Sequence, residues 1–138
     1  MNEFKEIISS SRKNLHRFES LMNKANSIIN LSAEQFRKFM IAATELFVNA
    51  VVHGNKEDES KNVFVEVFVS GSSIILIVKD EGNGFDVNSL ADPTLTENIM
   101  KESGRGVFII KSLVDEFDYK ITGKGSEVMI KVNKKPAE

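Results

Sequence analysis

The sequence contains no cysteine, which excludes a disulfide framework and a thiolate metal site. It has no apolar run long enough to cross a bilayer, and its first residues lack the apolar stretch of a signal peptide. It also lacks the excess of positive charge that draws proteins to nucleic acid, because its formal net charge is −2. We therefore expect a cytoplasmic protein that binds neither a membrane nor nucleic acid directly.

What the sequence does have is the composition of an ordinary folded domain. Its 138 residues, 41% of them hydrophobic, suffice for one domain with a substantial core and exclude a disordered polar chain. We expect a single domain at 1–138, with its core at about residues 5–133 and a short polar C-terminal tail.

Hydrophobic periodicity predicts both helices and strands. The expected helices span 11–30, 32–53 and 106–115, and the expected strands span 4–8, 63–69, 74–79, 117–121 and 128–132. The last four strands form two hairpins. This order favours a two-layer α/β (α+β) sandwich, in which a mixed, mostly antiparallel sheet has helices on one face.

The second expected helix carries a polar stripe. Glu45, Asn49 and His53 follow one another at four-residue intervals, so they share one side of the helix. The stripe is either a helix edge wetted by solvent or the wall of a site, because a buried carboxylate is costly without a partner. In a site, Asn49 offers an oxygen that suits Mg²⁺, and Glu45 could deprotonate a hydroxyl. His53 could instead cap the last carbonyls of the helix.

Two glycine clusters follow the apolar strands. Asp80, Gly82 and Gly84 form either a surface turn or a backbone that lets a ligand come close, with a carboxylate able to accept a hydrogen bond from an amino group such as that of adenine. Gly104, Arg105 and Gly106 open the third helix. They form either a hinge or an anion site, because a helix N-terminus offers free N–H groups.

A long segment, 86–103, lies between the two clusters. Segments of this length without secondary structure are uncommon in compact domains, and many are active-site lids or disordered loops. A lid at this place would exclude water during phosphoryl transfer. The sequence has no Walker A lysine motif, so a P-loop enzyme is excluded.

Taken in order, these motifs resemble those of the histidine-kinase-like (GHKL) ATPases. E-L-F-V-N-A-V-V-H-G at 45–54 resembles the N box of that superfamily, D-E-G-N-G-F at 80–85 its first glycine box, and S-G-R-G-V-F-I-I at 103–110 its second. Gly125-Ser126 resembles the last box. The compact length, the H-G that closes the N box and the D-P in the expected lid resemble one branch, the bacterial anti-sigma factor serine/threonine-protein kinases.

The resemblance implies a Bergerat-type ATP-binding fold and a site for ATP and Mg²⁺. Asn49 would hold Mg²⁺, Glu45 would act as the catalytic general base, and Asp80 would bind the adenine amine beside Ser126. The other nucleotide-binding positions that the resemblance implies are His53, Gly82, Gly84, Gly104, Arg105 and Gly106. One position departs from the pattern, because Glu127 stands where a second hydroxyl is expected. On a strand, its side chain points away from that of Ser126.

The resemblance also implies a function. Such a kinase holds a sigma factor inactive, binds an anti-anti-sigma antagonist protein and phosphorylates a serine on it, and it usually forms a homodimer. Two alternatives remain open at this point: a stand-alone catalytic domain that phosphorylates histidine, and a nucleotide-gated regulatory binding module without kinase activity.

Overall fold

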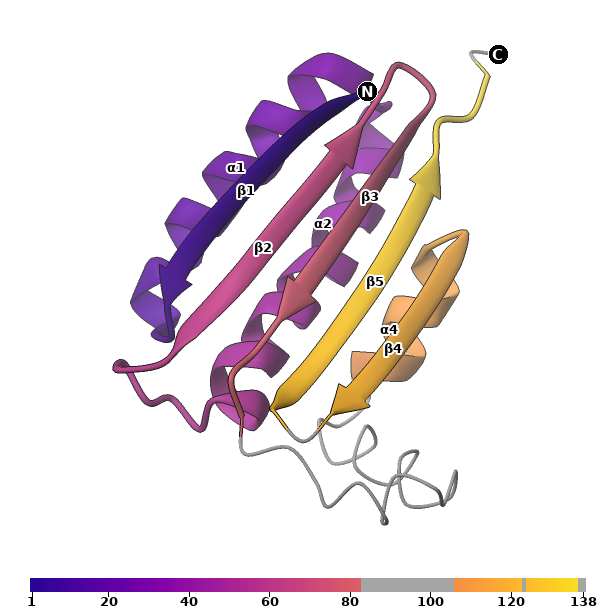
Figure 1. Ribbon diagram of the computed structural model, residues 1–138. Helices are drawn as coiled ribbons and strands as arrows, with labels where there is room; N and C mark the ends of the chain where they lie inside the picture. The colour runs from indigo at the N-terminus through magenta and orange to yellow at the C-terminus, as the bar shows by residue number, and fades with distance from the viewer. Residues whose placement is uncertain (83–105, 123, 137–138) are drawn as a thin grey trace.

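The computed structural model describes residues 1–82, 106–122 and 124–136. Figure 1 shows two layers, with a five-stranded sheet in front of the helices. The strand order is β1-β2-β3-β5-β4, formed by β1 (Asn2–Ser9), β2 (Asn62–Val69), β3 (Ser73–Lys79), β5 (Gly125–Asn133) and β4 (Glu116–Thr122). The second layer contains α1 (Leu15–Ile29), α2 (Ala33–Asn49) and α4 (Gly106–Leu113), with a 3₁₀ turn (Arg12–Asn14) before α1 and a π-helical turn (Ala50–Gly54) after α2.

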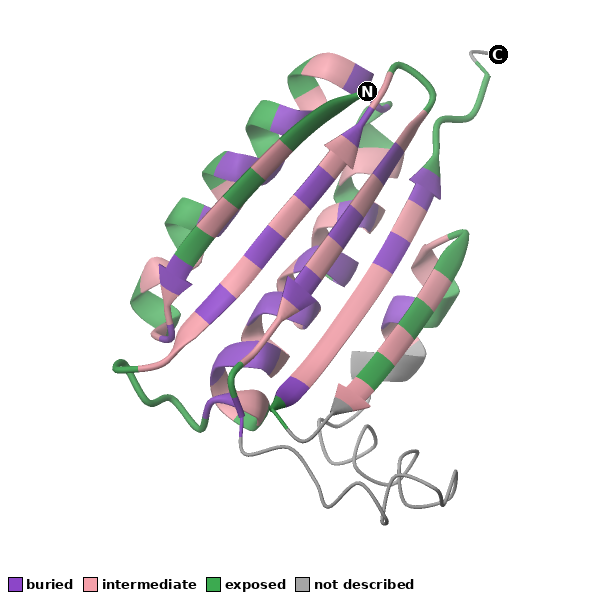
Figure 2. Ribbon diagram, viewed as in Figure 1, coloured by how far each residue is buried: buried purple, intermediate pink, exposed green. Residues whose placement is uncertain are grey.

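The sheet has one buried face because apolar residues alternate along its strands. In β2 every second residue is buried, beginning with Val63, and β3 alternates in the same way from Ile74 to Val78. Figure 2 shows this alternation as purple and pink bands across the central strands. Since neighbouring side chains of a strand point to opposite faces, the buried set faces the helices and forms the core with them.

Cap residues stand at the start of α2 and at the end of α1. The side chain of Ser32 accepts a hydrogen bond from the N–H of Gln35 at 3.1 Å, and α1 ends at Asn30 in the left-handed conformation (φ 54°). The rings of Phe18 and Phe47 stack with centroids 4.9 Å apart and join α1 to α2. The side-chain amide of Gln35 donates to the carbonyl of Asn133, so it ties α2 to the end of β5.

The fold class predicted from the sequence is confirmed, and each predicted helix and strand is present within a few residues of its expected ends. The sheet is more uniform than the mixed one we expected, because all four pairings of the described strands are antiparallel. The segment 86–103, predicted to be a lid, lies outside the described residues. In the described part of the chain, no helix is long and apolar enough to span a membrane.

Candidate nucleotide-binding site

The candidate site lies at the end of the sheet where β3 stops and β5 begins (Figure 1). Lys79, the last residue of β3, pairs with Glu127 in the antiparallel register. The residues one step beyond this pair, Asp80 and Ser126, therefore lie opposite each other. The N–H of Asp80 donates to the carbonyl of Ser126 at 3.0 Å, which continues the ladder by one bond.

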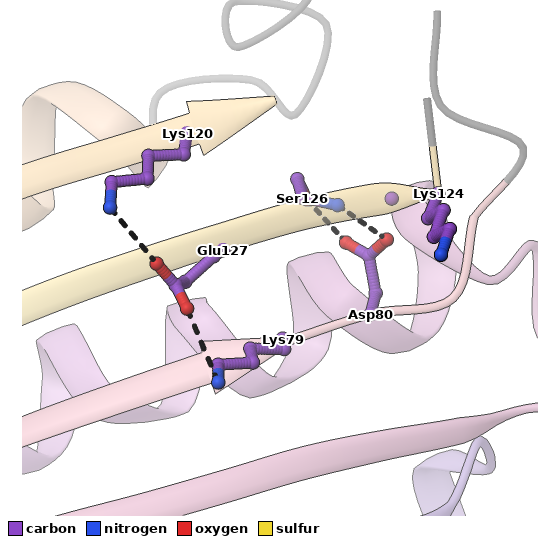
Figure 3. Close-up of a pocket in the computed structure, with 7 residues that line it drawn as sticks. Lys79, Asp80, Lys120, Lys124, Ser126 and Glu127 are labelled. Carbon is purple, nitrogen blue, oxygen red and sulfur yellow. Dashed lines mark hydrogen bonds and ion pairs between the residues drawn. The ribbon is translucent and has the colours of Figure 1, made fainter. Parts of the chain in front are cut away.

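The carboxylate of Asp80 is fixed by several hydrogen bonds. Its Oδ1 accepts from the N–H of Gly82 at 2.9 Å and from the N–H of Ser126 at 3.1 Å. Its Oδ2 accepts from the hydroxyl of Ser126 at 2.5 Å. Figure 3 shows the carboxylate of Asp80 turned toward Ser126. Hydrogen bonds to an ionised carboxylate are among the stronger ones in proteins, so its orientation is set before any ligand arrives.

Three glycines surround Asp80, and each is required by a close approach. A Cβ on Gly54 would overlap the carboxylate of Asp80, and a Cβ on Gly82 would overlap the carbonyl oxygen of Gly54. A Cβ on Gly125 would overlap the carbonyl oxygen of Asp80, and Gly125 has a φ of 143°, which favours glycine. The segments around 54, 82 and 125 thus meet at one carboxylate.

Glu45 and Asn49 lie one turn apart in the second half of α2, as the four-residue spacing predicts. Both are half-buried. Within the described part of the chain, neither side chain has a hydrogen-bond or ion-pair partner. A partly buried carboxylate and a neighbouring amide without protein partners are the features expected of the wall of a ligand site. The α2 extension ends at Gly54, against Asp80, so this wall leads toward the fixed carboxylate.

His53 lies beyond the end of α2, in a π-helical turn and not in the α-helix that the sequence predicts. The turn Ala50–Gly54 is π-helical, so its hydrogen bonds skip one more residue and change the angular step that we assumed for an α-helix. The side chain of His53 is exposed. The carbonyls of Ala50 and Val51 accept from the N–H groups of Asn55 and Glu57, at 2.8 and 2.7 Å, so the backbone caps this end. A role of His53 toward a nucleotide stays a prediction.

Gly104 and Arg105 of the second glycine cluster lie outside the described residues, and so does Gly84 of the first. Gly106 is the first residue of α4, as predicted. The helix packs against α2 and against β4. The predicted anion site at its N-terminus stays a prediction.

The side chain of Glu127 points to the opposite face of β5 from that of Ser126, as the alternation along a strand predicts. Its carboxylate lies 3.3 Å from the ammonium of Lys79 and 4.0 Å from that of Lys120, and Figure 3 marks these two contacts. Lys79 also donates to Glu66 at 2.8 Å. This hydrogen bond raises the pKa of Lys79, and Glu127 raises it further, while burial opposes both. The carboxylate of Glu127 is therefore paired with lysines, in the pocket that Asp80 and Ser126 also line.

Asn55 is a residue that the sequence analysis missed. It follows the glycine that ends the π-helical turn, and its side chain is fully buried. Its amide contacts the backbone of Glu81 and of Asn62. No periodic pattern indicates such a residue, because its partners lie 26 and 7 positions away in the sequence. Gly54 and Gly125 belong to motifs that the sequence analysis recognised, but their close contacts with Asp80 were not predicted.

The described residues contain no cluster of three or more histidine, aspartate or glutamate side chains that could hold a metal ion alone. In nucleotide sites, Mg²⁺ is usually bound by one or two protein oxygens together with the phosphates of the substrate. The side-chain oxygen of Asn49, which has no protein partner in the described residues, is a suitable ligand of this kind.

Comparison with known families identifies this class of fold. Residues 8–132 match the histidine kinase-like ATPase domain family, and the chain belongs to that family. The family that the motifs predict is thereby confirmed.

Named relatives lie in the branch that the motifs resemble. The chain is 28% identical over 101 residues to the anti-sigma F factor of Clostridium perfringens strain SM101, covering 71% of this chain and 72% of the relative. It is 30% identical over 98 residues to the anti-sigma F factor of Thermoanaerobacter sp. strain X514, covering 69% and 68%. It is 30% identical over 89 residues to the serine-protein kinase RsbW of Bacillus subtilis strain 168, covering 60% and 56%.

A solved structure supports the fold. The blue-light activated histidine kinase of Erythrobacter litoralis EL346 superposes with a TM-score of 0.55 at 20% sequence identity. The match covers 86% of this chain, and this chain spans 40% of the length of that kinase. The likeness is therefore one of fold, a two-layer domain within a longer protein.

Proposed function

We propose that this protein is an ATP-dependent serine/threonine-protein kinase of a partner-switching module. The observation that carries the proposal is the fixed carboxylate of Asp80, ringed by three glycines at the end of a helix whose Glu45 and Asn49 lack protein partners among the described residues. Membership of the histidine kinase-like ATPase domain family and relatives named anti-sigma F factor and serine-protein kinase support it.

The residues fit a bound ATP. Asp80 offers a carboxylate to the amino group of adenine, held by the hydroxyl and the N–H of Ser126. The close contact of the Gly54 and Gly82 backbones leaves no side chain between that carboxylate and a planar base. When bound, Mg·ATP supplies the phosphoryl group and a metal that neutralises its charge. Asn49 would hold the Mg²⁺. His53, Gly84, Gly104, Arg105 and Gly106 stay predicted nucleotide contacts.

Glu45 would receive the proton of the attacking serine hydroxyl. Its carboxylate has no cation or donor beside it in the described residues, so it is not occupied by another contact. A base placed one helical turn from the metal-binding amide would lie near the transferring phosphate. General bases of this kind typically contribute about a hundredfold to ten-thousandfold in rate.

The partners belong to the same proposal. We expect the chain to hold a sigma factor inactive and to release it on binding an anti-anti-sigma protein, which it phosphorylates on serine. A homodimer and a cytoplasmic location complete this expectation. The relatives named anti-sigma F factor support the sigma factor as one partner.

The first experiment identifies the partners. The tagged protein is captured from its own cells with and without Mg·ATP, and the bound chains are identified by mass spectrometry. A sigma factor in one state and a small protein carrying phosphoserine in the other are the expected result. An acid-labile phosphoproduct would replace the proposal with histidine phosphorylation. Nucleotide-dependent capture without any phosphoryl transfer would replace it with a nucleotide-gated binding module.

The second experiment tests Glu45. In Glu45→Ala, transfer of labelled phosphate to the captured antagonist should fall by at least about a hundredfold, while ATP binding stays largely unchanged. Glu34→Ala is the matched control, because Glu34 is an exposed glutamate in the first turn of the same helix. Normal transfer by Glu45→Ala would remove the general-base assignment.

A further inference from the structure

Asn55 joins three segments that the sequence keeps apart. Its Nδ2 donates to the carbonyl of Asn62 at 2.9 Å, at the start of β2. Its Oδ1 accepts from the N–H of Glu81 at 2.7 Å, directly after Asp80. Its own N–H closes the π-helical turn by donating to Ala50 at 2.8 Å. A fully buried amide with these bonds joins the end of the α2 extension to the ends of two strands.

Glu81 closes the same connection from the other side. Its Oε2 accepts from the N–H of Asn62 at 2.6 Å, while its own N–H is the donor to Asn55. The side chains of Asn55 and Glu81 thus both bind the backbone of Asn62, and the N–H of Glu81 donates to the side chain of Asn55. We call these three residues the Asn55 clamp.

The clamp lies beside the contacts that shape the candidate site. Asn55 follows Gly54, and Glu81 stands between Asp80 and Gly82. The backbones of Gly54 and Gly82 approach so closely that neither could carry a Cβ without a shift. The bonds of Ser126 hold Asp80 from the side of β5. On the other side, the clamp is what fastens the segment 80–82 to the end of the α2 extension.

A buried asparagine can also serve stability alone, because each unpaired polar group in a core is costly. The two roles make different predictions. If Asn55 only stabilises the fold, its replacement should weaken nucleotide binding no more than a core substitution that lowers the free energy of unfolding by the same amount. A positioning Asn55 changes the recognition of the base in particular, since it holds the backbone next to the carboxylate that would read the amino group of adenine.

We infer that Asn55 is a positioning residue for nucleotide recognition, which acts by holding the 80–82 segment, and with it the carboxylate of Asp80, against Gly54. The inference rests on the proposed function, because it takes the ligand of Asp80 to be adenine. Glu81 is the second member of the Asn55 clamp, although its side chain is exposed and no sequence pattern indicates a role for it.

The test compares ATP and GTP binding, measured by titration calorimetry in Mg²⁺, across four variants and the unaltered protein. Asn55→Ala should lower the affinity for ATP about tenfold and reduce the preference for ATP over GTP by a similar factor. Glu81→Ala, which removes the acceptor for Asn62, should lower the affinity roughly threefold. Glu81→Gln keeps an acceptor oxygen and should restore binding.

Val67→Ala is the control for stability. Val67 is buried in the middle of β2, and its truncation leaves a cavity in the core away from Asp80. This variant should keep the ATP affinity and the ATP preference of the unaltered protein even where urea denaturation shows a loss of stability equal to that of Asn55→Ala. Equal effects of Val67→Ala and Asn55→Ala on nucleotide binding would overturn the positioning role.

Amide hydrogen exchange without nucleotide separates this inference from the proposed function. In Asn55→Ala, the amides of Gly82 and Ser126 should exchange at least about tenfold faster, while amides of the β1–β2 pairing stay unchanged. If the unaltered protein binds no ATP but these amides respond, the proposed function fails and the clamp remains as a device for another ligand of Asp80. If it binds ATP and the amides do not respond, the clamp fails and the proposed function stands.

Discussion

The two ends of β3 both carry glycines, but one end is closed by residues close in the sequence and the other by residues far away in it. At the start of β3, Ser70 and Ser73 close a turn within four residues, and the hydroxyl of Ser70 accepts from the N–H of Ser72 and of Ser73, at 3.2 Å each. Gly71 in this turn has no atom within 4 Å of the position where a Cβ would stand. At the other end, Asp80 is held by Ser126, 46 residues away.

The comparison shows what distinguishes a site from a turn. The turn at Gly71 is closed by hydrogen bonds among its own residues, and the N–H of Lys134 also donates to the carbonyl of Ser72 at 2.9 Å. At the Asp80 end, segments that follow α2 and β3 meet the start of β5. Their glycines are needed because the backbones come into close contact there, and not because the chain turns. In this protein, the glycines whose Cβ would overlap another segment lie at the candidate site. The glycine with open space around it lies in a hairpin turn.

The largest expected effect contrasts the glycines of the two ends. Gly125→Ala should lower the free energy of unfolding by about 3 kcal/mol, because the added Cβ meets the backbone of Asp80 and the φ of 143° is strained for alanine. Gly71→Ala should change it by less than about 0.5 kcal/mol. Urea denaturation of both variants measures the difference. Equal losses in the two variants would mean that the Asp80 end is no more tightly packed than the hairpin turn.

The fold could be predicted because its signals are local. Valines at every second position of β2 predict a strand with one buried face, and the buried residues are those valines. Ser32 predicts the start of α2 because its hydroxyl binds the N–H of Gln35 within one turn. The resemblance of the glycine boxes added the family, which residues 8–132 then confirmed.

The parts of the site that could not be predicted depend on long-range geometry. The π-helical turn at Ala50–Gly54 leaves the apolar pattern unchanged, so the sequence predicted an α-helix that continues to His53. The side chain of Gln35, in the first turn of α2, binds the carbonyl of Asn133 near the other end of the sequence, which no local pattern indicates. Asn55 was missed for the same reason: its partners are distant in the sequence.

A smaller effect contrasts neighbouring residues of β5. Ser126→Ala removes the hydroxyl that binds Oδ2 of Asp80 and should weaken ATP binding about fivefold, which corresponds to one hydrogen bond. Glu127→Gln should leave ATP binding unchanged, because Glu127 lies with Lys79 and Lys120 on the other side of the strand. Titration calorimetry at one Mg²⁺ concentration gives both values. A marked loss in Glu127→Gln would show that this acid does reach the nucleotide.

The smallest effect concerns Lys79, the residue next to Asp80 on the open face of the sheet. Its pKa is raised from 10.5, first by the hydrogen bond to Glu66. A raised pKa in the folded state means that the stabilisation is fully present below the unfolded pKa and is lost as the pH rises through the folded value. Because the side chain is 39% exposed, Lys79→Met should cost less than about 1 kcal/mol at neutral pH.

The difference in unfolding free energy between the unaltered protein and Lys79→Met should therefore stay constant between about pH 6 and about pH 9 and shrink above 10.5, the ordinary pKa of lysine. Urea denaturation across this range measures it. Lys38→Met, which breaks an exposed ion pair in the first turns of α2, is the control for removing a surface lysine. A difference that grows as the pH rises would contradict the ion pairs of Lys79 as its source. Lys79→Met and Lys38→Met should bind ATP with equal affinity, because neighbouring residues of a strand such as Lys79 and Asp80 point to opposite faces of the sheet. An equal ATP affinity together with a pH-dependent loss of stability would show that Lys79 stabilises the open face of the sheet and does not contact the nucleotide.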